Sequence, residues 1–277
     1  MKFWMVHDKI IYTKQLGNTD LFTNPIRDFL SKNNFKFDLQ QVADMFSDET
    51  EKRGMMKIKD DIAYLPVNGV IGPFEDWIAR WIGATSIFSL TKALKNILSD
   101  ESIKGVFMPF DTPGGSIQGV DEASELIRQI ATKKPVFAQV TGEMCSAGYY
   151  MGSGATRIYA NNRSNFIGSI GTKLILEDDS EMLQNLGIKT IVIDTGDKKS
   201  LGESGNPITD EHIEYLQNLV NQMQRWFEES VLAGRPNLAI QEVNDGSLFL
   251  AEDAVKKGMI DGIMPMEQAY RRLMMQI

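Results

Sequence analysis

One short stretch of small residues contains a serine that can act as a nucleophile. It reads Gly142-Glu-Met-Cys-Ser146-Ala-Gly-Tyr-Tyr150 and follows an apolar run typical of a strand. The stretch favours the start of a short helix, where backbone N–H groups and the helix dipole stabilise negative charge near Ser146. Serine is also a common helix N-cap, and Cys145 beside it is a second candidate nucleophile. The residues alone leave open a catalytic serine, a capping serine and a reactive cysteine.

A second stretch contains a lysine that can serve as the general base. Asp194-Thr-Gly-Asp-Lys-Lys199-Ser200 follows a run of β-branched residues. A lysine accepts a proton when it is desolvated, because burial disfavours the ammonium form. Histidine, the commoner base, occurs only as His7 and His212. The composition therefore suits a Ser–Lys pair better than a Ser–His–Asp triad, although a lysine in a charged loop is more often simply solvated.

Two further stretches are rich in glycine. One directly follows an apolar run, and the other lies within one. Asp111-Thr-Pro-Gly-Gly115 follows such a run, and the N–H groups of its glycines can hold a developing oxyanion. An ordinary strand-to-helix turn uses the same Pro-Gly pair. Phe166-Ile-Gly-Ser169-Ile-Gly171 is typical of a bulged or sharply bent strand.

Alternating strands and helices must position these stretches. Apolar runs predict strands at 62–67, 105–110, 135–140, 157–160 and 190–193. Helical spacing predicts helices at 87–98, 120–130, 147–154, 209–232 and 251–257, with weaker helical periods at 24–32 and 38–46. Thr209 is the expected N-cap of the long helix, and Gly258 the expected end of the last one. This alternation predicts an α/β protein with a mostly parallel sheet.

Composition and charge narrow the class of protein. The 277 residues carry a formal net charge of -8 and no long basic run, which argues against a nucleic-acid partner. No apolar run is long enough to span a membrane, so we expect a cytoplasmic protein without a membrane anchor. The single cysteine, Cys145, excludes an internal disulfide. Residues 1–57 differ in composition and end near a charged linker at 48–54, so we expect an appendage before a domain at 58–277.

Taken in order, the motifs resemble those of the signal peptide peptidase A family of serine peptidases, peptidase family S49. They are most similar to the branch that tailed phages and prophages encode for head, or capsid, maturation. The resemblance covers roughly residues 58–265, through stretches at 62–71, 83–86, 111–115, 146–150, 168–171, 196–199, 206–209, 233–235 and 249–262.

The resemblance implies a role for each motif. The family's nucleophile falls on Ser146 and its base on Lys199, at the end of a Gly-x-x-Lys stretch. The family's oxyanion donors fall on the N–H groups of Gly114 or Gly115 and of Ala147. The implied fold is that of the Clp protease proteolytic subunit and crotonase, built from repeated ββα units. It also implies homo-oligomers whose subunit contacts commonly complete the active sites, and no metal or organic cofactor.

These implications predict a serine endopeptidase acting on a polypeptide substrate. A phage capsid or scaffold protein is the expected substrate, cleaved in the host cytoplasm or the procapsid. Three alternatives stay open: a soluble cellular peptidase, a crotonase-like acyl-CoA enzyme with Glu143 as its carboxylate, and an inactive assembly scaffold. Lys198 is the alternative base.

Overall fold

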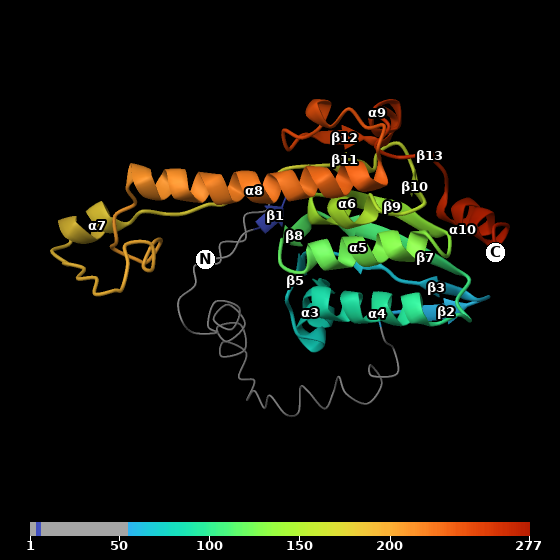
Figure 1. The fold of residues 1–277 in the computed structure, drawn as a ribbon, viewed down its shortest axis with the longest axis horizontal. Helices are drawn as coiled ribbons and strands as arrows, with labels where there is room; N and C mark the ends of the chain where they lie inside the picture. Colours follow the sequence, from blue (N-terminus) through green and yellow to red (C-terminus); the bar gives the residue numbers. More distant parts are fainter. Residues whose placement is uncertain (1–3, 7–54) are drawn as a thin grey trace, which may run out of the picture.

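The computed structural model describes residues 4–6 and 55–277 of the chain (Figure 1). The predicted helical periods at 24–32 and 38–46 and the linker at 48–54 lie outside the described residues. The helices are α3 (Asp76–Ile82), α4 (Ile87–Ser99), α5 (Val120–Ala131), α6 (Ala147–Gly152), α7 (Ser180–Asn185), α8 (Asp210–Gly234), α9 (Ala251–Lys256) and α10 (Met266–Met274). The strands are β1 (Trp4–Val6), β2 (Lys57–Lys59), β3 (Ile62–Tyr64), β4 (Val67–Asn68), β5 (Ile71–Gly72), β6 (Thr85–Ser86), β7 (Gly105–Thr112), β8 (Gly114–Ser116), β9 (Val136–Cys145), β10 (Arg157–Ala160), β11 (Phe166–Gly168), β12 (Leu248–Leu250) and β13 (Gly262–Ile263).

A mostly parallel sheet forms the centre of the molecule. Its strands lie in the order β12-β11-β9-β7-β3-β2, with β4 beside β7 and β10 beside β9 and β13. The inner strands β3, β7, β9 and β11 pair in parallel, whereas β2 and β12 pair antiparallel with their neighbours. Parallel neighbours need crossover connections, and α4, α5 and α6 lie on these crossovers. The expected α/β class is confirmed.

A smaller sheet stands beside the large one. Its strands lie in the order β1-β8-β5-β6. β5 pairs in parallel with β6 and β8, and β1 pairs antiparallel with the other edge of β8. The chain passes from β7 of the large sheet to β8 of the small one through Pro113 alone. The Pro-Gly-Gly stretch therefore joins two sheets, and its two glycines begin a strand.

Helices cover both faces of the large sheet. Side chains alternate across a strand, and on β7 this alternation separates two apolar clusters. Val106 and Met108 pack in the main core, which includes Leu94 of α4 and Ile127 of α5, whereas Phe107 packs with α10 on the other face. The helix predicted at 87–98 is confirmed, with its buried face formed by Ile87, Leu90, Ala93, Leu94 and Ile97.

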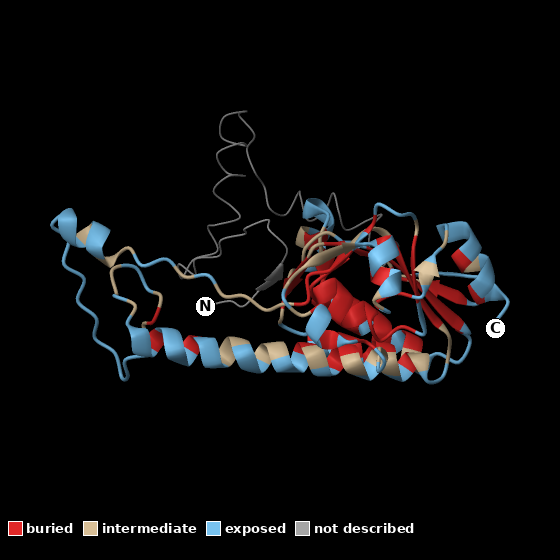
Figure 2. Cartoon of the chain, turned by 90° about the horizontal axis from the view of Figure 1, so that it is seen from above, coloured by how far each residue is buried: buried red, intermediate tan, exposed pale blue. Residues whose placement is uncertain are grey.

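A long arm extends from this core. We call residues 172–209 the arm; it includes α7 and lies along the first half of α8, beyond both sheets (Figures 1 and 2). Helix α8 has 25 residues, and its C-terminal half packs on α5 and α6. Near its N-terminus only His212 and Leu216 are buried, whereas Phe227 and Val231 anchor its other end in the core.

The strand predicted at 190–193 is wrong. Within the described ranges no strand pairs with it, and the side chains of Ile191 and Ile193 are 72% and 94% exposed. A β-branched run forms a strand only where a neighbour supplies its hydrogen bonds and packing, and the arm lies away from both sheets (Figure 1). The run is part of the exposed arm.

The predicted helix ends are confirmed. The Thr209 hydroxyl accepts the N–H of His212 at 3.3 Å, and α9 is followed by Gly258 with a φ of 77°. Among the helices of the described residues, none combines the length and apolar character needed to cross a membrane.

Candidate active site

Ser146 occupies the bend between β9 and α6. Its φ of 51° and ψ of -120° lie outside the regions that L residues normally adopt. Two hydrogen bonds of 2.8 Å fix this bend: the Ser146 N–H donates to the Gly168 carbonyl, and the Tyr150 N–H donates to the Ser146 carbonyl. Such strain costs about 1–3 kcal/mol and persists where the surroundings enforce it, often at functional sites.

The hydroxyl of Ser146 has no structural role within the part of the chain that the structure describes. Its Oγ is buried and has no hydrogen-bond partner among the described residues. A capping serine would accept an N–H from the first turn of its helix, but the Ser146 side chain makes no such bond to α6. Because this bond is missing, the simple N-cap interpretation is wrong. A buried hydroxyl without a partner is costly, which favours the interpretation of Ser146 as a reactive residue.

Cys145 is poorly suited to be the nucleophile. Its side chain is fully buried, and its Sγ lies 3.9 Å from the Phe166 carbonyl oxygen. Burial, with Glu143 nearby, raises the pKa of the Cys145 thiol well above its ordinary value. Because the thiolate is the reactive form, this thiol behaves as a small apolar group. Glu143 lies near the same thiol, on the face of β9 that Cys145 shares.

The Gly-Gly strand β8 and Ser146 both follow the C-terminal ends of neighbouring strands in the large sheet. β7 and β9 are parallel neighbours that pair through Thr112 and Met144, and the chain continues from each into one part of the site. Gly115 follows β7, and Ser146 with Ala147 follows β9. As the first residue of α6, Ala147 has an N–H without a carbonyl partner inside the helix. The structure thus brings the predicted nucleophile and the predicted oxyanion donors together.

Thr112 holds the beginning of β8 in place, a role that the sequence did not predict. Its hydroxyl accepts the Gly114 N–H at 3.1 Å and donates to the Gly69 carbonyl at 2.5 Å. The Gly114 N–H is therefore engaged, which favours Gly115 as the oxyanion donor of the two glycines. A Cβ on Gly115 would lie 1.9 Å from the Ile71 carbonyl oxygen, so only glycine fits there. The one sequence signal for Thr112 was its place between the strand and the glycines.

The bent strand predicted at 166–171 supports the nucleophile. β11 ends at Gly168, whose φ is 121°, and Ser169 follows with a φ of 50°. The Gly168 carbonyl accepts the Ser146 N–H, while the Ser169 N–H donates to the Ser247 carbonyl at 2.8 Å. The predicted bend is confirmed. It places the Gly168 carbonyl within hydrogen-bond distance of the Ser146 N–H.

His212 is engaged away from the candidate site. His212 is buried at the start of α8, and its Nδ1 accepts the Thr209 N–H at 3.3 Å. It is part of the cap at the start of α8, and His7 lies outside the described residues.

Lys199 lies on the arm and is exposed. Its backbone N–H donates to the Gly196 carbonyl at 2.9 Å, so the Gly-x-x-Lys stretch forms a turn. The neighbouring Lys198 contacts α8 instead, with its Nζ 3.4 Å from Glu211 and 5.3 Å from the centre of the Tyr215 ring. This part of the arm therefore packs against the beginning of α8.

Ser146 lies at the other end of α8. Tyr150, in the helix that begins after Ser146, places its hydroxyl 3.2 Å from the Trp226 carbonyl. At about 1.5 Å per residue, the helix positions of Tyr215 and Trp226 are roughly 16 Å apart along the axis. A single chain therefore holds the arm, which carries Lys199, away from the start of α6 (Figure 1).

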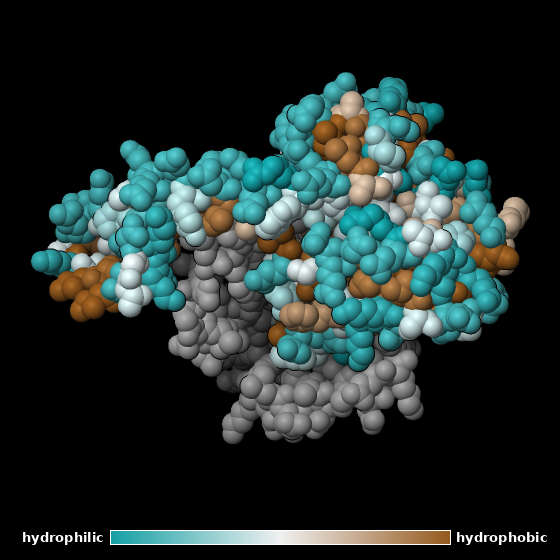
Figure 3. Space-filling model, in the orientation of Figure 1, coloured by the Kyte–Doolittle hydropathy of each residue, from teal (hydrophilic) through white to brown (hydrophobic). Residues whose placement is uncertain are grey.

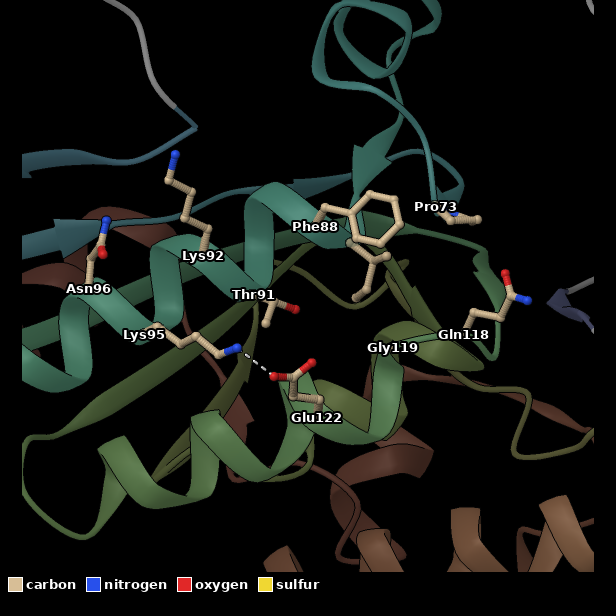
Figure 4. A pocket seen from close by; sticks show the side chains of 10 residues that line it. Pro73, Phe88, Thr91, Lys92, Lys95, Asn96, Gln118, Gly119 and Glu122 are labelled. Carbon is tan, nitrogen blue, oxygen red and sulfur yellow. Dashed lines mark ion pairs between the residues drawn. The ribbon is translucent and has the colours of Figure 1, made fainter.

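A separate pocket lies between α4 and α5. It has a volume of about 660 Å³ and opens between Phe88, Lys95 and Glu122, the last two of which form an ion pair of 2.7 Å (Figure 4). None of the predicted catalytic or oxyanion residues lines it. The pocket is thus distinct from the candidate site.

Comparison with known proteins finds relatives whose names describe proteases or peptidases. The capsid assembly protease C of Escherichia phage lambda is 26% identical, over 75% of this chain and 47% of its own length. MJ0651, a candidate protease of Methanocaldococcus jannaschii, is 32% identical over 65% of this chain and 58% of its own. A candidate signal peptide peptidase SppA of Enterococcus faecium is 28% identical over 82% and 66%. The chain thus spans about half to two thirds of these relatives.

Two solved structures also align with most of this chain. A ClpP1 mutant from Listeria monocytogenes aligns with 74% of this chain and 93% of its own, with 14% identity and a TM-score of 0.47. An enoyl-CoA hydratase from Mycobacterium smegmatis aligns with 80% and 75%, with 12% identity and a TM-score of 0.48.

The model of one family, peptidase family S49, matches residues 128–277. This range is more than half of the chain and includes both Ser146 and Lys199. The match agrees with the strained serine at the end of β9 and with the sequence motifs. The chain belongs to peptidase family S49.

Proposed function

We propose that the chain is a serine endopeptidase in which Ser146 is the nucleophile and Lys199 the general base. The observation that carries the proposal is the Ser146 hydroxyl, which is buried on a strained turn beside the Gly-Gly strand and has no partner in residues 4–6 and 55–277. A nucleophile of this kind needs a base that takes its proton and donors that hold the oxyanion.

The proposed chemistry is acyl transfer. Neutral Lys199 takes the proton of the Ser146 hydroxyl as Oγ attacks the peptide carbonyl carbon. The N–H groups of Ala147 and Gly115 hold the resulting oxyanion; losing one such donor typically costs about 10²–10³ in turnover. The protonated lysine then gives its proton to the leaving amine, and water, deprotonated by the same lysine, releases the acyl group from Ser146.

We propose further that the base comes from the arm of a second copy of the chain. Within one chain, α8 separates Lys199 from Ser146. The arm exposes apolar side chains that nothing in the described residues covers, and Figure 3 shows apolar surface gathered at its far end. These side chains are Met182, Leu186, Ile188, Ile191 and Ile193. Exposed apolar surface of this kind is typical of an interface, and enclosure there would remove water from Lys199 and favour its neutral form.

The proposed substrate is a capsid or scaffold polypeptide, cleaved in the host cytoplasm or procapsid. The similarity to the phage lambda capsid assembly protease supports it. A cellular peptidase is the second candidate, supported by the 32% identity to the archaeal relative. Residues 1–57 are proposed as an appendage of the peptidase domain, with β2 marking where the large sheet begins.

The crotonase-like alternative requires a catalytic carboxylate. Glu143, its candidate, lies near the buried Cys145 thiol, where it raises that thiol's pKa. An inactive scaffold would have no need to keep a strained serine whose buried hydroxyl bonds to none of the residues that the structure describes. Both alternatives are thus less well supported than hydrolysis by Ser146.

The test compares hydrolysis of quenched fluorescent peptides and of casein by the wild type and Ser146→Ala. We expect cleavage by the wild type and none by the variant. Hydration of crotonyl-CoA is measured in parallel. Hydration without peptide cleavage would contradict the proposal in favour of the crotonase-like alternative.

A further inference from the structure

Strand β8 carries the Gly-Gly motif and has two different neighbours. One edge pairs in parallel with β5, with Gly115 opposite Ile71. The other edge pairs antiparallel with β1, a three-residue strand from the beginning of the chain, as Figure 1 shows. The register sets Val6 opposite Gly114, Met5 opposite Gly115 and Trp4 opposite Ser116. A distant segment of the chain therefore covers the second edge of β8.

This edge lies where a peptide must approach the nucleophile. A substrate of Ser146 has to place its carbonyl oxygen at the N–H groups of Gly115 and Ala147. Its backbone then runs beside β8, and β5 already occupies the other side. Sheet edges bind extended polypeptides through main-chain hydrogen bonds, with little dependence on sequence.

We propose that β1 is a built-in occupant of the outer edge of β8, the edge beside which a substrate of Ser146 must lie, and that the substrate has to displace β1. The proposal rests on the proposed function. The pairing of Met5 with Gly115 sets β1 at the proposed oxyanion donor. A strand of three residues makes few hydrogen bonds, so a longer peptide can replace it.

Displacement has a defined kinetic effect. While β1 is bound, only the fraction of molecules with an open edge takes substrate, and the apparent affinity falls by that fraction. Release of β1 therefore lowers KM for peptide substrates and leaves kcat unchanged. A separate peptide with the sequence of residues 2–8, Lys-Phe-Trp-Met-Val-His-Asp, competes with substrate at the opened edge.

The test uses Met5→Pro in the full-length chain. Proline removes one N–H and disfavours pairing inside a strand, whereas the matched variant Met5→Ala keeps the backbone donor. Amide hydrogen exchange is followed by mass spectrometry in fragments that contain residues 114–116. We expect exchange there at least about tenfold faster in Met5→Pro than in Met5→Ala. We also expect a several-fold lower KM, with inhibition by the 2–8 peptide strongest for Met5→Pro.

Three other outcomes contradict the proposal in distinguishable ways. Equal exchange in the two variants would show that β1 does not cover the edge. Faster exchange with unchanged or weaker hydrolysis would overturn the substrate assignment of this edge and leave the peptidase function standing. No hydrolysis by the wild type or either variant would contradict the proposed function, and this inference with it.

Discussion

The ring of Tyr150 stacks on that of Phe227, with centroids 4.8 Å apart and planes 25° apart. The contact joins the helix that begins after Ser146 to α8. The Tyr150 hydroxyl lies 3.0 Å from Asp121 and 3.2 Å from the Trp226 carbonyl, and burial raises its pKa, so the hydroxyl stays neutral. Because α8 is continuous over 25 residues, this anchor directs the arm away from the nucleophile of its own chain.

Replacing Ser146 separates catalysis from stability. Ser146→Ala should abolish peptide hydrolysis and leave the free energy of unfolding unchanged or higher, because the lost hydroxyl is buried and no described residue bonds to it. Ser146→Gly should also be inactive and more stable by about 1 kcal/mol, because glycine tolerates a positive φ. Urea unfolding measures both changes. A clear loss of stability in Ser146→Ala would mean that the hydroxyl has a structural partner.

Cys145→Ala should keep peptide hydrolysis, since the thiol is a packing group. Burial raises the folded-state pKa of this thiol above its ordinary 9.0, so the unfolded chain ionises first. The thiol's contribution to stability is fully present below pH 9 and is lost as the pH rises above it, by up to about 1.4 kcal/mol per unit. Cys145→Ala should therefore show a shallower decline in stability between pH 9 and 10. An inactive Cys145→Ala with active Ser146→Ala would reverse the nucleophile assignment.

The Thr112 hydroxyl should hold the oxyanion strand in place. Thr112→Val removes the acceptor of the Gly114 N–H and the donor to the Gly69 carbonyl. We expect a loss of about 1–3 kcal/mol in unfolding free energy and at least about a tenfold fall in kcat, because the oxyanion donor shifts. Thr112→Ser, which keeps the hydroxyl, is the control and should recover most of kcat. An unchanged kcat in Thr112→Val would remove this residue from the positioning of the site.

The fold was predictable because its strands and helices are strongly patterned. Helix α4 repeats apolar residues on one face, and the buried strand at 105–110 is almost continuously apolar. The failure at 190–193 has a physical cause, since β-branched residues predict a strand only when a sheet lies beside them. Sequence spacing also could not reveal the contact of Tyr150 with Phe227, or Thr112 as the residue that engages Gly114. Each depends on chain segments that only the folded structure brings together.

The two neighbouring lysines should differ. Lys199→Met should abolish hydrolysis, whereas Lys198→Met should retain it, because Lys198 is engaged with Glu211 and Tyr215. Both variants should unfold at nearly the wild-type urea concentration, since exposed ion pairs contribute about 0–1 kcal/mol. Turnover of the fluorescent peptides provides the readout. Full activity in Lys199→Met with an inactive Lys198→Met would transfer the role of base to Lys198.

Supply of the base by a second copy is tested most directly by mixing two inactive variants. Ser146→Ala keeps an intact Lys199, and Lys199→Met keeps an intact Ser146. The two proteins are unfolded together and refolded as a mixture, so that copies of both kinds can share an assembly. We predict that the mixture regains a substantial fraction of wild-type hydrolysis, while each variant refolded alone stays inactive. A mixture that assembles but stays inactive would contradict a site completed between copies.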